Sequence, residues 1–132
     1  MRKFLIILLV AILVFHFFAL KYNWYHTVWW LDIPMHMIGG IWLGVLFYYL
    51  FAEKLSWISK AHPLFFLLAG LGFVILIGVF WEWLDFFLDV IVFKSYPYNA
   101  EPGYILFDTH TDFFNDLLGG AIALLGLIKF KK

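Results

Sequence analysis

The chain has 132 residues, of which 65% are hydrophobic and 23% aromatic, and its mean hydropathy is +0.93. A soluble domain of this length exposes too much surface to water to hold so apolar a sequence, so the composition indicates an integral membrane protein. The absence of cysteine excludes disulfides and thiolate metal sites, and a formal net charge of zero gives no sign of nucleic-acid binding.

Four apolar runs, at residues 4–20, 33–52, 63–92 and 113–130, are each long enough to cross the hydrocarbon core. A transmembrane helix needs about 20 residues for this. The first run follows a basic start and could be a cleavable signal peptide, but no small-residue cleavage site ends it, which favours a retained helix. The third run is longer than needed and must tilt or project from the bilayer. We therefore expect one all-α transmembrane domain, a bundle of four helices.

The basic residues predict the orientation of this bundle. Seven of them fall at the N-terminus, in the connection between the second and third runs, and at the C-terminus: Arg2, Lys3, Lys54, Lys60, Lys129, Lys131 and Lys132. With four spans these three segments share one side, and the positive-inside rule makes that side cytoplasmic. Both termini are then cytoplasmic in what we expect to be a prokaryotic cell membrane. The connections at 21–31 and 93–111 become extracytoplasmic, and the second, with Pro97, Pro102 and Gly103, is expected to be a loop.

Eight of the nine carboxylates fall on the extracytoplasmic side in this topology: Asp32, Glu82, Asp85, Asp89, Glu101, Asp108, Asp112 and Asp116. Most of them recur at intervals of three or four residues, which places them on common helix faces. Like charges at these intervals repel, and acids near the end of the third run also oppose the helix dipole. Protons or a bound cation must balance so many acids in a medium of low dielectric constant.

A divalent metal ion, Mg²⁺, Mn²⁺ or Zn²⁺, suits this set of oxygen ligands with one imidazole. The expected ligands lie deepest and on matching faces: His36, Glu82, Asp85, Asp112 and Asp116. Asp32 and Asn115 are expected to support them. Asp108 and His110 are the candidate catalytic groups, with His110 or a spare carboxylate as the base.

Simpler roles compete with these assignments. Asp32 precedes Ile33-Pro34 and fits a helix cap, and Asp108 could cap the last helix. Asp89 and Glu101 are expected to be solvated, and His16 is as consistent with a hydrogen-bonded core histidine as with a functional one. The glycines at 39–44, 70–72, 119–120 and 126 are expected to form close helix contacts, and the tryptophan clusters to anchor the membrane interface.

Three segments resemble the YjdF-type inner-membrane proteins. Residues 32–39 match an Asp-x3-His-x2-Gly motif, Glu82-Trp83 matches an acidic position near the end of a later span, and residues 108–119 match Asp-Thr-x2-Asp-x6-Gly. The likeness covers most of the chain from Asp32 onward. YjdF-type proteins have more spans, so this chain resembles a shorter version. The resemblance implies a polar site within the membrane, but it brings no reaction.

The VanZ-like proteins, linked to glycopeptide resistance, have a similar layout. They carry an early Asp-x3-His and a late Asp-x3-Asn-x2-Gly, and here Asp116 stands where that Asn would be, with Asn115 before it.

Three classes of function remain open. One is a metal-assisted hydrolase or phosphotransferase acting on a lipid-linked substrate, in contact with membrane lipids and able to form a homo-oligomer. The second is a component of a cation or proton transporter, because acids within the membrane are typical of those proteins. The third is a non-catalytic protein whose polar cluster binds lipid or specifies packing. No paired serine and histidine indicates a covalent mechanism.

Overall fold

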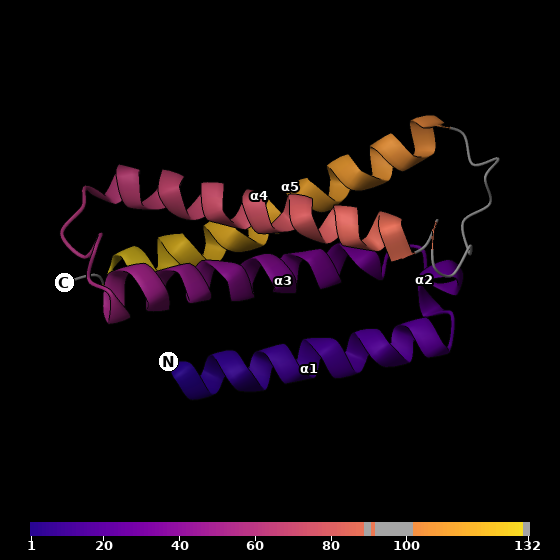
Figure 1. Cartoon of the computed structure of the whole chain (residues 1–132), viewed down its shortest axis with the longest axis horizontal. Coiled ribbons are helices and arrows are strands. Elements are labelled where there is room, and N and C mark those ends of the chain that lie inside the picture. Colours follow the sequence, from indigo (N-terminus) through magenta and orange to yellow (C-terminus); the bar gives the residue numbers. More distant parts are fainter. Residues whose placement is uncertain (89–90, 92–101, 131–132) are drawn as a thin grey trace.

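The structure, a computed structural model, describes residues 1–88, 91 and 102–130, and its described part is helical without strands. The helices are α1 Arg2–Lys21, the short α2 Trp24–Thr27, α3 Asp32–Phe47 with its π-helical continuation η1 Tyr48–Lys54, α4 Pro63–Phe87 and α5 Pro102–Ile128 (Figure 1). Four of them are long and apolar enough to cross a membrane. The predicted all-α bundle of four membrane-spanning helices is thus confirmed, while the orientation of its termini stays a prediction.

The fourth helix begins earlier than the sequence suggested. Pro102 is its first residue, so residues 102–111 are helical and the loop expected there is wrong. Proline fits the first helical turn because no intrahelical partner is needed for its missing N–H. The polar residues that follow are compatible with a helix, since Thr111 satisfies its hydroxyl by donating to the carbonyl of Phe107 at 2.8 Å. Asp108 lies inside this helix and cannot cap it.

Glycines bring α3 and α5 into backbone contact. A Cβ at Gly40 would overlap three backbone atoms of Asp116, and a Cβ at Gly119 would overlap the carbonyl of Met37. Small residues allow such close approach between membrane helices. A Cβ added at Gly72 or Gly126 would meet nothing within 4 Å, so the expectation of close packing is wrong at these two positions.

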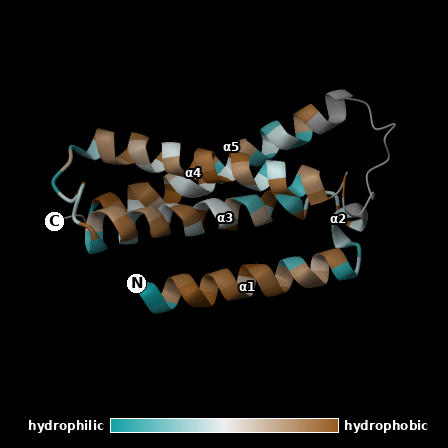
Figure 2. Ribbon diagram, in the orientation of Figure 1, coloured by the Kyte–Doolittle hydropathy of each residue, from teal (hydrophilic) through white to brown (hydrophobic). Residues whose placement is uncertain are grey.

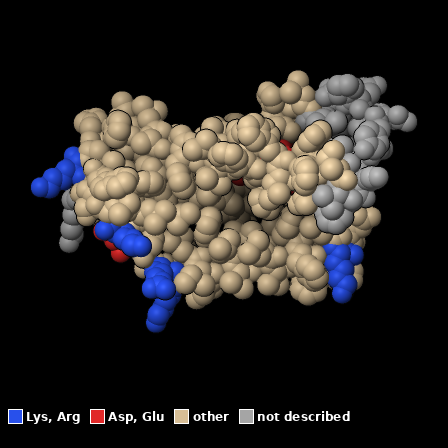
Figure 3. All heavy atoms as spheres, viewed as in Figure 1, with Lys and Arg blue, Asp and Glu red and all other residues tan. Residues whose placement is uncertain are grey.

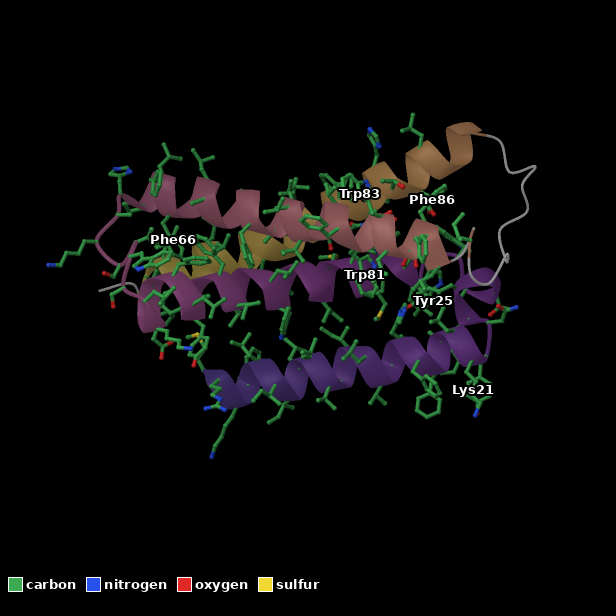
Figure 4. The ribbon with its side chains drawn as sticks, viewed as in Figure 1. Lys21, Tyr25, Phe66, Trp81, Trp83 and Phe86 are labelled. Atoms are coloured by element: carbon green, nitrogen blue, oxygen red, sulfur yellow. The ribbon has the colours of Figure 1, made fainter. Side chains whose placement is uncertain are left out.

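The apolar core lies at the opposite end from the acids. Its buried members are Phe47 of α3, Ala52 of η1, Phe66 of α4 and Leu124 of α5 (Figure 4 labels Phe66). Leu124 fills the space left by Gly70. Helix α1 is peripheral and buries little besides Leu5 and Ala19. Most of its apolar surface faces outward, as a helix in lipid requires (Figure 2).

The two ends of the bundle differ in charge. The N and C labels lie at one end of the molecule, where Tyr48 donates to the carbonyl of Phe130 at 3.2 Å and where most Lys and Arg atoms gather (Figures 1 and 3). We call this the basic end. The acidic end comprises the C-terminal turn of α1, α2, the start of α3, the last turns of α4 and residues 106–116 of α5.

Candidate metal centre

His36 is the centre of the acidic cluster. It lies one turn inside α3, and its side chain is only 10% exposed. Its Nε2 is 3.6 Å from a carboxylate oxygen of Asp32 and 3.6 Å from one of Asp112, and its Nδ1 is 3.3 Å from an oxygen of Asp116. Three carboxylates from two helices therefore surround one imidazole.

Asp32 belongs to this group and does not cap its helix. It is the first residue of α3, the capping position is Leu31, and no side-chain hydrogen bond closes the helix start. Its carboxylate instead points toward His36, which lies one helical turn further along α3, because side chains four residues apart are neighbours on a helix. The expected cap is wrong, and Asp32 contacts His36 as their four-residue spacing indicated, while its supporting role in a site stays a prediction.

Asp116 lies deeper than the other two acids. It lies one helical turn beyond Asp112 along α5, about 6 Å at 1.5 Å per residue. The side chain is 7% exposed, and one of its oxygens lies 2.9 Å from where a Cβ of Gly78 would be. Gly40 on α3 thus makes room for the backbone of Asp116, and Gly78 on α4 makes room for its carboxylate.

The contact with Asp116 orients the imidazole. At 3.3 Å it is a long hydrogen bond, with Nδ1–H donating to the carboxylate when His36 is neutral. The Nε2 lone pair then points toward Asp32 and Asp112. A histidine that donates one ring nitrogen to a carboxylate while the other is free is the arrangement typical of metal ligands.

Asp32, His36 and Asp112 form a compact set of ligand atoms. One atom from each lies within 4.8 Å of the other two, so among the described residues these three could hold a metal ion. Their Nε2–oxygen separations of 3.6 Å are too long for good hydrogen bonds. They are close to the spacing of about 3.0–3.4 Å expected for two ligands that share an ion at about 2.1 Å.

The other predicted site residues surround this set at different depths. Glu82 is half-buried and hydrogen-bonds Thr109, so α4 is tied to the first turns of α5. Asp85 is exposed, Asp108 is half-buried, and His110 is exposed. Asp108 still lies within electrostatic range of Asp32 and His36.

Asn115 is 5% exposed, and its side-chain nitrogen has no hydrogen-bond partner in the structure. Asp89 and Glu101 lie outside the described residues.

Tyr25 was missed by the sequence reasoning. Its hydroxyl lies 2.8 Å from Nδ1 of His16, and the His16 ring also meets the edge of Trp81 on α4, with centroids 5.7 Å apart. The contact follows from a chain reversal at Asn23, which adopts a left-handed conformation that asparagine tolerates. In the sequence, Asn23 was the one local indication that the chain reverses at this point. His16 is therefore hydrogen-bonded, as one of its two expected roles required, and its ring contacts Trp81 on α4, while a functional role stays a prediction.

Comparison with known proteins identifies the family. A family described as "Predicted membrane protein (DUF2238)" matches residues 1–132. The chain belongs to this family. DUF2238 is the YjdF family, so the resemblance to YjdF-type proteins is confirmed, whereas the likeness to VanZ-like proteins stays a prediction. Neither curated proteins nor solved structures gave a match.

Proposed function

We propose that this YjdF-family protein binds a divalent metal ion through Asp32, His36 and Asp112 and uses it on a lipid-linked substrate at the extracytoplasmic face. One observation supports this above the rest. Nε2 of His36 faces two carboxylates, while the third, Asp116, takes Nδ1. The ring is therefore oriented for coordination before any ion arrives.

Electrostatics favours a bound cation. Among the described residues of the acidic end Lys21 is the one lysine or arginine, and it lies over the ring of Tyr22 at 5.7 Å, on the exposed side of α1. It does not neutralise the carboxylates around His36. Three carboxylates around one imidazole keep a net negative charge even when that imidazole is protonated, which is costly in a medium of low dielectric constant. A divalent ion removes that cost at the point where the acids converge.

A divalent ion would supply a Lewis acid for a phosphoryl or carbonyl oxygen and a means of activating water. The chain's own residues would complete the reaction. A carboxylate outside the ligand set, Asp108 or Glu82, could accept the proton of the attacking water, and Thr109 positions Glu82 by its hydrogen bond. Exposed His110 is the alternative base.

The depth of Asp116 favours a second candidate, a proton- or cation-handling component of a transporter. An acid paired with a histidine well inside a span is typical of such proteins. The two candidates differ in one requirement, since only the first needs a bound divalent ion in the purified protein.

Manganese binding tests the proposal. Protein purified in detergent without chelator should bind one Mn²⁺ per chain, measured by electron paramagnetic resonance of the free ion. Asp112→Asn removes a ligand and should lower the affinity at least thirtyfold. Asp116→Asn leaves the ligands in place and should lower it about tenfold, within the range measured for residues that orient ligands.

Glu53→Gln is the matched control, because this exposed carboxylate lies at the basic end and should not affect binding. Equal Mn²⁺ affinity in Asp112→Asn and Glu53→Gln would contradict the metal centre. Absence of binding in the unmodified protein would favour the proton-handling candidate.

A further inference from the structure

His16 stands apart from its surroundings in the first helix. It is the one polar side chain between Phe4 and Leu20, and lipid offers its ring no partner. The structure gives it one, because the chain turns back after α1 and brings the hydroxyl of Tyr25 to 2.8 Å from Nδ1. The two rings are also tilted against each other, with centroids 5.6 Å apart.

This pair packs against α4, the helix that carries Glu82. His16 meets Trp81, the neighbour of Glu82 on α4, and it lies within electrostatic range of Asp32 and His36. Tyr25 likewise interacts electrostatically with Asp32. Figure 4 shows Tyr25 and Trp81 on the side of the bundle that faces α1. Asp32 is thus the common neighbour of the pair and of the His36 imidazole, and its side chain is 38% exposed.

The pair keeps one hydrogen available for a third group. A neutral imidazole has one N–H and a tyrosine one O–H, and their mutual bond uses only one of the two. If Tyr25 donates to Nδ1, then Nε2–H of His16 remains, and if His16 donates, the hydroxyl hydrogen remains. Burial raises the pKa of Tyr25, and the nearby Asp32 and Asp85 raise it further, so the hydroxyl stays protonated at neutral pH.

The described side chains in direct contact with the His36 ring are carboxylates, which are mostly hydrogen-bond acceptors. An anion bound to a metal ion there would keep one or more oxygens that need hydrogen-bond donors. Among the described side chains on the α1 side of Asp32, His16 and Tyr25 can supply them.

The membrane offers a route to this place. Figure 3 shows the surface hollowed between α3 and α4, with Asp or Glu atoms at the edge of the hollow. The outer surface of α4 near its C-terminal end carries exposed aromatic side chains, among them Phe80 and Trp83, which suits contact with acyl chains. A ligand with a polar head and an apolar tail can place each part in its preferred medium here.

We propose that His16 and Tyr25 bind a phosphate oxygen of a membrane lipid whose other phosphate oxygens contact the metal ion. The inference rests on the proposed metal centre and names its substrate class, a phosphate carried on a lipid. In this arrangement His16 and Tyr25 bind the phosphate from the side of α1. The metal ion, held by Asp32, His36 and Asp112, binds the phosphate from the opposite side.

Lipid-dependent thermal stability tests the proposal. The full chain in detergent micelles with saturating Mg²⁺ is titrated with dioleoyl phosphatidic acid, and the melting temperature should rise with lipid concentration. Dioleoylglycerol, which has the same tails without phosphate, should have no such effect. Inorganic phosphate, titrated separately, reports whether the phosphate alone is recognised.

Two tyrosine variants locate the donor. Tyr25→Phe removes only the hydroxyl and should raise the half-saturating concentration of phosphatidic acid at least tenfold, since hydrogen bonds to charged groups are among the strongest. Tyr22→Phe is the matched control, because Tyr22 is exposed and stacks on Phe18 and Trp24 away from His16. His16→Phe should reproduce the loss seen for Tyr25→Phe, and all three variants should keep their Mg²⁺ affinity.

Several outcomes would overturn the proposal. Equal lipid response in Tyr25→Phe and Tyr22→Phe would remove the pair from the binding site, and equal response to dioleoylglycerol would show that only the tails bind. A Tyr25-dependent response to inorganic phosphate without one to phosphatidic acid would support phosphate recognition and overturn the lipid as its source. Mg²⁺ binding without any phosphate response leaves the metal centre standing and refutes this inference. A Tyr25-dependent lipid response without Mg²⁺ binding refutes the metal centre instead.

Discussion

The contact of Gly40 with α5 joins the fold to the candidate centre, and a single methyl group tests that connection. Gly40 lies one turn beyond His36 on α3, and the Cβ of Gly40→Ala would overlap the O, C and Cα atoms of Asp116. These are backbone atoms of a helix, so no side-chain rotation relieves the overlap. The helices must separate, by about 1 Å if ordinary van der Waals distances are restored.

The size of the effect follows from two opposing terms. Overpacking a tight contact costs about 1–3 kcal/mol, whereas replacing glycine by alanine inside a helix gains up to about 1 kcal/mol. With the full gain subtracted, the net destabilisation should be up to about 2 kcal/mol. The same separation moves His36 on α3 away from Asp112 and Asp116 on α5, so Mn²⁺ affinity should fall about tenfold or more, the equivalent of about 1.4 kcal/mol.

Gly72→Ala is the matched control for this experiment. Gly72 lies inside α4 with nothing within 4 Å of the added methyl group, so the variant has the helix-propensity gain without the overlap. Melting temperature in detergent and Mn²⁺ titration are measured for both variants. If Gly40→Ala and Gly72→Ala have the same melting temperature and the same Mn²⁺ affinity, then the close backbone contact of α3 with α5 does not exist, and it cannot position the ligands of the candidate centre.

Two further predictions concern orientation and core packing. The chain has no cysteine, so a single introduced cysteine can be labelled selectively. Ser56→Cys should resist a membrane-impermeant thiol reagent in intact cells, because the connection between the second and third spans is expected to be cytoplasmic, while Thr27→Cys should react. The reverse labelling pattern would place the acidic end inside the cell. Leu124→Ala should destabilise the protein by about 2–5 kcal/mol in thermal unfolding, because Leu124 is fully buried against Gly70 and Phe47. The neighbouring Leu125 is 53% exposed, so Leu125→Ala should cost little stability. Similar losses in the two variants would contradict the assigned core.

The sequence was sufficient for the helices because the bilayer imposes a simple rule. A span must be helical and about 20 residues long, so apolar runs gave four helices without knowledge of their packing. The error at 102–111 has the opposite origin. Those residues are too polar to be recognised from hydropathy, and the structure includes them in α5, which begins at Pro102.

The candidate centre was only partly predictable from the sequence. The spacing of residues along a helix shows which side chains share a face, but it does not show which residues of other helices they contact. The four-residue interval from Asp32 to His36 indicated their contact, and the structure has it. Spacing could not show which acids of α4 and α5 meet the imidazole, since this depends on the rotation of each helix. That rotation is set by Gly40 and Gly119, whose lack of a side chain lets Asp116 and Asp112 come close to His36.

The glycines also explain why α3 and α5 are packed more tightly than α1. The tight backbone contact of α3 with α5 holds His36 and its carboxylates at fixed separations, which a metal centre needs. Helix α1 is different, because few of its side chains are buried, and its described polar links are Trp42 donating to the carbonyl of Leu5 and the His16–Tyr25 pair. Loosely packed elements open at low free-energy cost. In the proposed function, the tight α3–α5 contact would keep the ion's ligands in place, while displacement of α1 would let a lipid head group reach the donors of His16 and Tyr25.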